Sequence, residues 1–499
     1  MRKILNYRPI VLIAIFLLIG VTIGGILIGN NILLFCVSII TLAMGIFMFV
    51  LKKKSIFLIV FLSLFVGIIA ITIDFGVSNI AQYNEENVFV SGRVCVLNDN
   101  EFVLDSISID GDKKNGKINV EYNDENIYSI GDEVKLVGVI SNNENDIFSF
   151  YEMSKFEDHI YYNLNNIEEI RIVGNKLKFN EKVKKNFATY VYKYCHKEEA
   201  GIIIGLVFGD KSYLLDTDKT AINGVGMSHI LAVSGLHIGF LFGIIIYLTK
   251  KLRQKPIVSL ILIILVWIIY GILTGFPPGI KRAGIMSIVY IIGVLCVRKN
   301  DSLTTLSLAS IIIILSNPRE LFTLGFILSI SAVLGIICFA PMIRKKILGN
   351  KDSKFARLVA NGVAISFSAN IFILPISFNV FNNVAIYTIL ANLIILPFVS
   401  MGYVMVIIVA LLTIISKPLG VLYLVAQVPI TLLRIIANGV YQLPFAVISV
   451  YSMSFASISY LIGCFAVTPY FMIEKKKKKK IFVIFMTISI LLYFLAIIF

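Results

Sequence analysis

The sequence predicts a polytopic α-helical membrane protein that carries one small all-β domain as an insertion. Three observations predict this fold class. Of its 499 residues, 58% are hydrophobic and only 15% are charged, whereas a soluble domain is about a quarter charged. About 13 apolar segments approach the length that a helix needs to cross a bilayer. One polar region, near residues 80–180, instead shows the alternation of short β-strands.

Residues 1–76 are predicted to form three transmembrane helices, with apolar runs at about 9–29, 32–51 and 55–75. The first run has no small-residue cleavage signature, so we interpret it as a retained helix. Basic residues precede the first run and separate the second from the third: Arg2, Lys3, Arg8, Lys52, Lys53 and Lys54. Positive residues stay in the cytoplasm, so the amino terminus is predicted to be cytoplasmic and the third helix to lead outside. The same rule explains much of the net charge of +15 without invoking nucleic acid.

Residues 77–180 are predicted to form an extracytoplasmic, OB-like barrel, because five or six short strands alternate with Gly, Asn and Asp turns. OB-folds often bind single strands through a basic groove with stacking aromatics. Phe89, Phe102 and Tyr122 are present, but acidic residues outnumber basic ones about twofold, which favours a structural or docking role at least equally. Cys95 and Cys195 flank this region, and a disulfide between them stays open if it lies outside the cytoplasm.

Residues 181–228 are mixed in character and are predicted to lie along the membrane surface. Residues 229–473 form the main membrane domain, and residues 474–499 add a lysine run, interpreted as a topology anchor, and a last helix. The apolar runs of these two regions are 229–249, 257–276, 283–297, 303–316, 321–341, 358–380, 384–416, 419–441, 446–473 and 481–499. Pro397 divides the long run 384–416, which is expected to be broken or re-entrant. The total is therefore about 11 to 13 crossings.

The candidate functional residues begin with Gly209-Asp210 and the block Gly226-Met-Ser-His229-Ile-Leu-Ala-Val-Ser234-Gly235-Leu-His237-Ile-Gly239. The histidines are eight residues apart and so fall near one helical face. Ionisable residues inside a membrane are costly and usually face a cavity or a partner. Capping and packing of helix ends is an equally good explanation from the residues alone.

This block resembles the signature of the ComEC family of DNA-uptake channel proteins, a Gly-rich segment ending in Gly-Asp followed by GxxHxLAxSGLHxG. The resemblance continues through Lys281-Arg282-Ala-Gly-Ile-Met286 and through Asn317-Pro-Arg-Glu-Leu-Phe-Thr-Leu-Gly325-Phe-Ile-Leu-Ser329, where Asn317 replaces the usual Asp. It extends to the segments around Asn370, where Gln is common, and around Asn392. Nearly the whole chain is covered.

The resemblance implies a channel that passes single-stranded DNA across a bacterial cytoplasmic membrane. The path or gate would include Asp210, His229, Ser234, Gly235, His237, Lys281, Arg282, Asn370 and Asn392. Lys281 and Arg282 follow Pro277-Pro278-Gly279 and are expected near the outer mouth, where the positive-inside rule does not require cations. For any one asparagine, interhelical hydrogen bonding is the better explanation.

Many family members continue into a metallo-β-lactamase-like nuclease. These residues contain no HxHxDH among their four histidines and no ATP-binding motif, so we expect no cofactor and no enzyme activity here. An extracellular DNA receptor, a separate nuclease and a cytoplasmic ATPase are then implied partners, beside membrane lipids. Two alternatives stay open: a transporter of another polyanionic or lipid-linked substrate, and an intramembrane acid–base enzyme using Asp210, His229 and His237.

Overall fold

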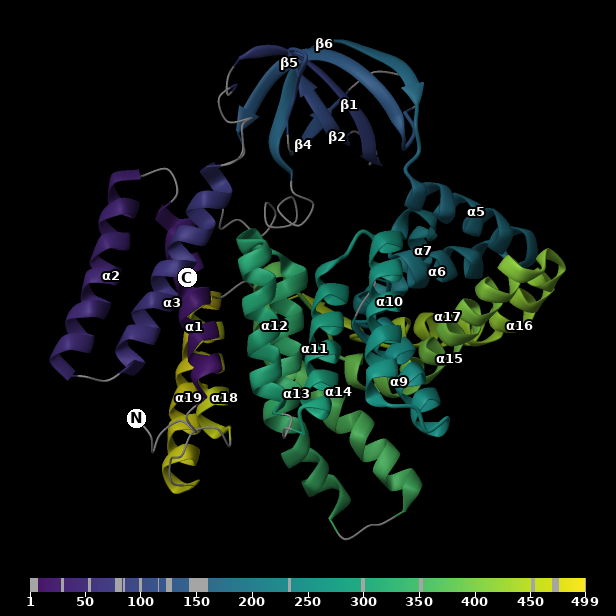
Figure 1. Ribbon diagram of the computed structural model, residues 1–499. Coiled ribbons are helices and arrows are strands. Elements are labelled where there is room, and N and C mark those ends of the chain that lie inside the picture. The colour runs from purple at the N-terminus through teal and green to yellow at the C-terminus, as the bar shows by residue number, and fades with distance from the viewer. Residues whose placement is uncertain are drawn as a thin grey trace. The chain divides into compact units, whose positions relative to one another are not determined.

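The computed structural model describes residues 8–27, 31–52, 55–76, 83, 86–97, 101–114, 116–122, 128–142, 160–231, 235–297, 301–349, 353–449, 454–468 and 475–498. Its internal contacts divide the chain into two compact units. We call residues 9–182 with 307–327 the N-terminal unit, and residues 1–8, 183–306 and 328–499 the C-terminal unit. The colours of Figure 1 follow the chain through both.

Three apolar helices open the N-terminal unit: α1 (Pro9–Leu27), α2 (Asn31–Lys52) and α3 (Ser55–Gly76). Glycines allow α1 and α3 to pack closely, because a Cβ at Gly20 would collide with the Leu64 carbonyl and one at Gly67 with the Leu17 carbonyl. The end of α3 is tied to the 3₁₀ helix η4 (Pro318–Phe322) by an ion pair between Asp74 and Arg319. Asn317, at the position where the family has Asp, caps η4 by accepting a hydrogen bond from the Arg319 N–H.

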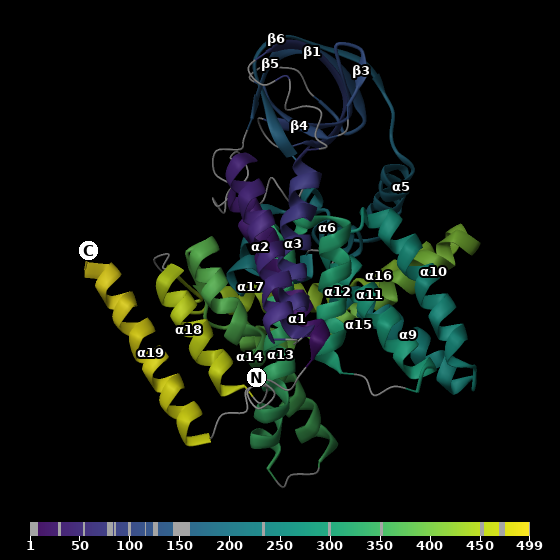
Figure 2. The same ribbon diagram turned by 60° about the vertical axis from the view of Figure 1, so that its left-hand side comes forward.

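Six strands form a small barrel in the same unit: β1 (Asn87–Leu97), β2 (Glu101–Ile109), β3 (Asp112–Lys113), β4 (Lys117–Glu121), β5 (Asp132–Asn142) and β6 (Ile160–Asn175). The sheet order is β1-β5-β6-β4-β2-β3, and a further β1–β2 pairing closes five strands into a ring. All pairings in the ring are antiparallel except β4 with β6, which is parallel. Figure 2 shows the strands curling around the barrel interior.

The barrel interior takes up aromatic side chains that the sequence offered for base stacking. Phe102 is wholly buried, and its ring lies 5.3 Å from Tyr122 and 4.9 Å from Tyr128. Of the three aromatics predicted to be available, only Phe89 is exposed. Alternation decides this, because one side of each strand must face the core. The stacking interpretation is therefore wrong for Phe102 and weak for Tyr122.

The C-terminal unit is almost entirely helical. Its first elements are α5 (Phe179–Tyr194, which starts in the N-terminal unit), α6 (Lys197–Phe208), η3 (Lys211–Tyr213), α7 (Asp216–Gly224), α8 (Ser228–Leu231), α9 (Gly235–Lys251), α10 (Pro256–Thr274) and α11 (Pro278–Leu295). α12 (Ser302–Ser316) and α13 (Leu324–Leu348) cross the division between the units. The later elements are α14 (Lys354–Phe381), β7 (Asn383–Ala385), α15 (Thr388–Ile415), η5 (Lys417–Leu422), α16 (Tyr423–Ala426), α17 (Val428–Tyr441), β8 (Val447–Ser449), α18 (Ser454–Val467) and α19 (Lys475–Ile498).

Seven helices among the described residues are long and apolar enough to cross a membrane. They are Pro9–Leu27, Ile56–Asp74, Pro256–Thr274, Leu324–Leu348, Lys354–Phe381, Thr388–Ile415 and Lys417–Tyr441. Leu33–Met48 and Ser302–Ser316 are shorter apolar helices. The larger number of crossings stays a prediction. α18 and α19 lie side by side in both views, joined by a hydrogen bond from Ser459 Oγ to the Phe485 carbonyl.

Two segments differ from the sequence-based expectation. The run 384–416 is not broken at Pro397, since α15 continues through it as one helix of 28 residues. A membrane helix tolerates a proline where neighbouring groups compensate for the lost hydrogen bond. Residues 197–208, expected at a membrane surface, form α6, in which every residue from Glu199 to Val207 is buried.

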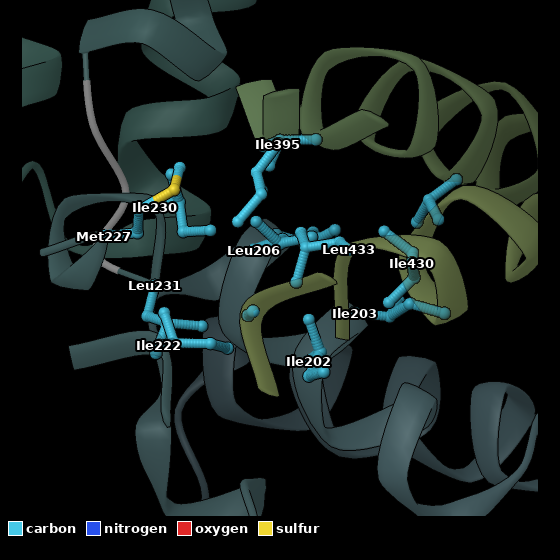
Figure 3. Close-up of a cluster of buried hydrophobic side chains, with 14 of the residues drawn as sticks. Ile202, Ile203, Leu206, Ile222, Met227, Ile230, Leu231, Ile395, Ile430 and Leu433 are labelled. Carbon is cyan, nitrogen blue, oxygen red and sulfur yellow. The ribbon is translucent and has the colours of Figure 1, made fainter. Parts of the chain in front are cut away.

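A large apolar cluster explains the burial of α6. Ile202, Ile203 and Leu206 of α6 meet Ile395 of α15 and residues of α17, as Figure 3 shows. Met227, Ile230 and Leu231 join from the segment that contains α8. The family-like block is thus held in the core of the C-terminal unit rather than on its surface.

Candidate functional site

The sequence-predicted residues converge most clearly where α9 and α11 begin. We call Gly235, His237, Lys281, Arg282 and Tyr403 the α9–α11 junction. Local sequence explains the helix ends. Gly275 ends α10 in the left-handed conformation, with φ of 80°. Pro278 stands in the first turn of α11, where its missing N–H costs nothing.

Glycine at position 235 allows the two helix starts to meet. A Cβ added to Gly235 would lie 3.4 Å from the Gly279 carbonyl, 3.4 Å from Ala283 Cβ and 4.0 Å from Arg282 NH2. α11 is fixed in turn on α10, because Trp267 Nε1 donates a hydrogen bond to the Ile280 carbonyl at 3.0 Å. Ser234, the remaining predicted residue of this block, lies outside the described residues.

The cations at the junction are buried to different degrees. Arg282 is 4% exposed and Lys281 is half-buried. The proline pair starts a helix instead of a long loop, so the first turn carries both residues into the packed unit. Arg282 is therefore a buried residue, and its place near the outer mouth stays a prediction. A buried guanidinium needs strong electrostatic compensation, which raises the functional weight of this residue.

His237 lies within the same packed region. Its side chain is wholly buried, and its ring centroid is 4.8 Å from that of Tyr403 on α15. Tyr270 of α10 donates a hydrogen bond from its hydroxyl to the Val207 carbonyl at 2.7 Å, which ties α10 to α6. The Tyr403 hydroxyl is also buried; it lies near the Tyr270 hydroxyl but makes no hydrogen bond of ordinary geometry among the described residues. A buried hydroxyl without a partner is costly and often marks a place that a ligand or water completes.

Several groups that carry positive charge gather at the junction. The amino-terminal end of a helix carries about half an elementary positive charge, and two such ends meet at Gly235 and Gly279. Lys281 and Arg282 add two formal charges in the first turn of α11. Groups of this kind favour an anion such as a phosphate.

His229 belongs to a different described helix from His237. It lies on the short helix α8, separated from α9 by residues outside the described part of the chain. Ser228 and His229 are exposed, whereas Met227, Ile230 and Leu231 are wholly buried. Residues 232–234 lie outside the described part of the chain, so a shared helical face of the two histidines stays a prediction.

Asp210 joins a different contact. It caps η3 by accepting hydrogen bonds from the Ser212 N–H at 3.0 Å and hydroxyl at 2.6 Å, and it pairs with Lys184 of α5 at 2.5 Å. Burial alone would raise the pKa of the Asp210 carboxyl, but Lys184 and Ser212 outweigh it and hold the pKa below its usual value. Its role is to hold η3 against α5, and no hydrogen bond or ion pair described for it involves either histidine of the acid–base hypothesis.

Asn392 makes a polar contact between α15 and α14, whereas the hydrogen bond of Asn370 stays within α14. Asn392 Nδ2 donates to Ser366 Oγ at 3.0 Å, and Asn370 Nδ2 donates to the Ser366 carbonyl at 2.9 Å. Asn392 Oδ1 and the hydroxyl of the wholly buried Ser368 have no hydrogen-bond partner in the described part of the chain. Asn392 thus forms the predicted interhelical hydrogen bond, and Asn392 Oδ1 and the Ser368 hydroxyl can still form further ones.

A charged cluster that was not predicted from the sequence lies where α17 packs against α6 and α7. We call it the α17 seam and define it as Glu199, Asp218, Thr431, Arg434 and Asn438. Arg434 Nε lies 2.8 and 3.0 Å from the Asp218 carboxylate oxygens, and Arg434 NH1 lies 3.8 Å from Glu199 Oε1. Both acids are at most 3% exposed. A signal was present, since Gln427, Thr431, Arg434 and Asn438 recur at helical spacing in an apolar segment.

Cys95 and Cys195, considered for a disulfide, are free thiols that belong to different units, so their pairing stays a prediction. Cys95 belongs to β1, while the Cys195 thiol is buried and donates to the Tyr423 carbonyl at 3.7 Å. Within the described ranges, no group of three His, Cys, Asp or Glu side chains could hold a metal ion.

The apolar helices, the inserted barrel and the buried polar sites define a membrane protein of the multi-helix class. The profile of the Competence protein family matches residues 206–476, which is more than half of the chain. The chain therefore belongs to the Competence protein family. The matched region contains the α9–α11 junction, the α14–α15 contact and α17.

Two curated relatives share this region. ComE operon protein 3 of Bacillus subtilis (strain 168) is 29% identical over 251 residues, covering 50% of this chain and 31% of the relative. Recombination protein 2 of Haemophilus influenzae is 25% identical over 224 residues, covering 43% of this chain and 28% of the relative. The alignments thus span about a third of each relative. No solved structure matches the chain significantly.

Proposed function

We propose that this chain is a channel that passes single-stranded DNA across the cytoplasmic membrane. The observation that carries the proposal is Arg282, a buried cation beside Lys281 at the meeting point of two helix amino termini. The resemblance to competence proteins gives the substrate class, and the junction supplies a chemistry that suits it. A phosphodiester needs a substitute for water and counterions when it enters a membrane protein.

The α14–α15 contact supports the same proposal. Past the cations, a strand requires hydrogen-bonding groups rather than further fixed charge, since a deep electrostatic well would trap it. Asn370, Asn392 and Ser368 supply amides and a hydroxyl on the helices that pack beside each other. His229, Ser234, Gly235 and His237 complete the proposed path or gate, and Asp210 contributes to it by fixing η3 against α5.

The inserted barrel supports an OB-like assignment, because five strands close with one parallel pairing. The basic residues that flank the first helices favour a cytoplasmic amino terminus and an extracytoplasmic barrel. A docking role for incoming DNA or its receptor fits the acidic composition better than base stacking does. A separate nuclease and a cytoplasmic ATPase would act with the channel.

The test is transformation of a naturally competent strain in which this is the sole gene of its family. The deletion strain is complemented with wild type, Arg282→Ala or Arg282→Lys, and transformants and internalised labelled DNA are counted. We expect deletion and Arg282→Ala to reduce uptake at least about 100-fold, on the order expected when a charge-assisted phosphate contact is lost inside a low-dielectric site. Arg282→Lys retains the charge but not the fork, so an intermediate value is expected.

Arg344→Ala is the matched control, because Arg344 is an exposed arginine of α13 in the same unit. Each variant is tagged and its membrane abundance is measured, so that loss of folding is separated from loss of transport. Normal DNA uptake by the deletion strain would exclude the channel and favour the transporter of another polyanion. Uptake restored fully by Arg282→Ala would show that the path does not use this cation.

A further inference from the structure

α5 and η3 form an exposed surface, and the proposed path uses only Asp210, the cap of η3, from this region. We define the α5–η3 surface as Lys185, Tyr192 and Lys193 of α5 with Lys211 and Tyr213 of η3. The rings of Tyr192 and Tyr213 pack against each other, with centroids 6.3 Å apart and an interplanar angle of 41°. Tyr192 is 37% exposed and Tyr213 is half-buried, so both rings keep part of a face toward solvent.

Asp210 builds this surface. Its carboxylate caps η3 through Ser212 and pairs with Lys184 of α5, and so fixes η3 against α5. Tight packing of α6 under η3 adds to this, because a Cβ at Gly201 would collide with the Tyr213 carbonyl. The relative position of Tyr192 and Tyr213 is therefore fixed by the ion pair between Lys184 and Asp210.

The charge of the surface is strongly positive. From residue 183 to residue 224, all of which the structure describes, the exposed charged side chains are Lys185, Lys193, Lys197, Lys211, Lys219 and Asp216. Lys185 and Tyr192 are seven residues apart on α5 and so lie on one face, two turns from each other. Proteins that bind single-stranded nucleic acids combine basic side chains for the phosphates with aromatic rings for the bases, and both are present on this face.

The outward face of α5 is built for water rather than for lipid. The apolar side of the helix is used internally, where Ala188 and Val191 are buried and Phe187 packs on Phe208 at 5.2 Å. A helix lying in the membrane interface would present its apolar side to the acyl chains instead. The exposed residues between Lys185 and Lys193 are Asn186, Thr189 and Tyr192.

We propose that the α5–η3 surface binds single-stranded nucleic acid on its way to the α9–α11 junction, with the tyrosine pair stacking on bases and the lysines contacting phosphates. This inference rests on the proposed channel function for its biological meaning. It assigns Asp210 a positioning role: the carboxylate neutralises Lys184 and sets the tyrosine pair without touching the strand.

The test measures binding of a fluorescein-labelled 20-nucleotide oligo(dT) to the purified full-length protein in detergent, by anisotropy over a range of salt concentrations. We expect Tyr192→Ala with Tyr213→Ala to weaken binding at least about fivefold, since base–aromatic stacking contributes substantially per base. The corresponding double substitution to Phe keeps the rings and should keep the affinity. Each lysine–phosphate contact contributes about 0.7 to the slope of log affinity against log salt for a single strand. Lys185→Ala combined with Lys193→Ala should therefore make this slope shallower by about 1.4.

Lys345→Ala with Lys346→Ala is the matched control, since both are exposed lysines of α13 in the same unit. Binding that is undetectable in wild type, unchanged in the tyrosine variant, or reduced equally in the control overturns the proposal. Native mass spectrometry of retained phosphatidylglycerol tests the lipid alternative. Lysine variants that lose this lipid and keep oligo(dT) binding identify a lipid surface and overturn the proposal as well.

The oligo(dT) assay and the transformation assay fail independently. Arg282→Ala should block uptake without changing oligo(dT) affinity, because Arg282 is buried away from the tested surface residues on another helix. Normal uptake in the deletion strain, with binding still dependent on the tyrosines, would remove the channel and leave the nucleic-acid surface.

Discussion

Two arginines of the C-terminal unit lie in opposite electrostatic surroundings. Arg434, in the α17 seam, contacts the carboxylate of Asp218 and faces that of Glu199, so the three groups carry a formal charge of −1. Arg282, in the α9–α11 junction, stands beside Lys281 and at the start of two helices. The seam holds acids that need a cation, whereas the junction concentrates positive potential that suits an anion.

The difference teaches how to separate a structural cation from a functional one. In the seam, the arginine satisfies groups that belong to the chain, and Thr431 adds a hydrogen bond to Glu199 at 3.2 Å. In the junction, buried groups such as the Tyr403 hydroxyl keep unused hydrogen-bonding capacity. Stability should therefore depend mainly on Arg434, and transport on Arg282.

The largest expected effect is that of Arg434→Gln. Removing the guanidinium leaves two nearly buried carboxylates without a counter-charge. The protein should be destabilised by roughly 3 kcal/mol. This is the low end of the range for a broken buried ion pair, because Arg434 is partly exposed. Arg344→Gln, at an exposed arginine of α13 in the same unit, should cost clearly less. Thermal unfolding of both variants in detergent measures the difference, and Asp218→Asn should partly rescue Arg434→Gln in a double-mutant cycle. Equal losses of stability in the two variants would contradict the structural role assigned to Arg434.

The second prediction concerns two glycines of the family-like block. Gly226 has φ of 76°, and a Cβ there would collide with Thr388 Oγ1, whereas a Cβ at Gly239 would meet no atom within 4 Å. Gly226→Ala should cost at least about 1 to 2 kcal/mol from the left-handed backbone alone. Gly239→Ala should be neutral or slightly stabilising. Unfolding temperature and membrane abundance of the two variants provide the measurement, and a neutral Gly226→Ala would contradict the assigned conformation.

The third prediction uses the ion pair of Asp210 with Lys184. Because the folded pKa of Asp210 is held below 3.8, its contribution is fully present above that pH and is lost as the pH falls through the lower folded pKa. The difference in unfolding temperature between wild type and Asp210→Asn should therefore be constant from pH 5 to 8 and shrink below about pH 4. A difference that grows on acidification would show that the carboxyl is not the stabilised form.

The smallest expected effect on stability is that of Tyr403→Phe. The buried hydroxyl makes no hydrogen bond of ordinary geometry among the described residues, so removing it should leave stability unchanged or raise it by up to about 1 kcal/mol. If the hydroxyl completes a site for the passing strand, uptake falls while stability holds. Unchanged uptake would remove Tyr403 from the junction's function and sharpen the role of Arg282.

Local sequence determined a large part of this protein. The length and composition of the apolar runs predicted the membrane class, and the strand alternation between Val88 and Ile140 predicted the inserted β domain. These properties depend on neighbouring residues, whose side chains must match lipid or a sheet face every 3.6 or two residues. The motif around Gly226 and Gly235 likewise predicted the Competence family, which the profile match confirmed.

Only the tertiary structure decided which groups meet and which are exposed. The sequence separates Arg434 from Asp218 by 216 residues, and nothing local brings the two together. It did not indicate that His237 would be wholly buried while His229 stays exposed. It offered Phe102 and Tyr122 to a nucleic acid, whereas the barrel closed over Phe102. Burial and partnership are properties of segments packed from distant parts of the chain, so no periodicity within one segment determines them.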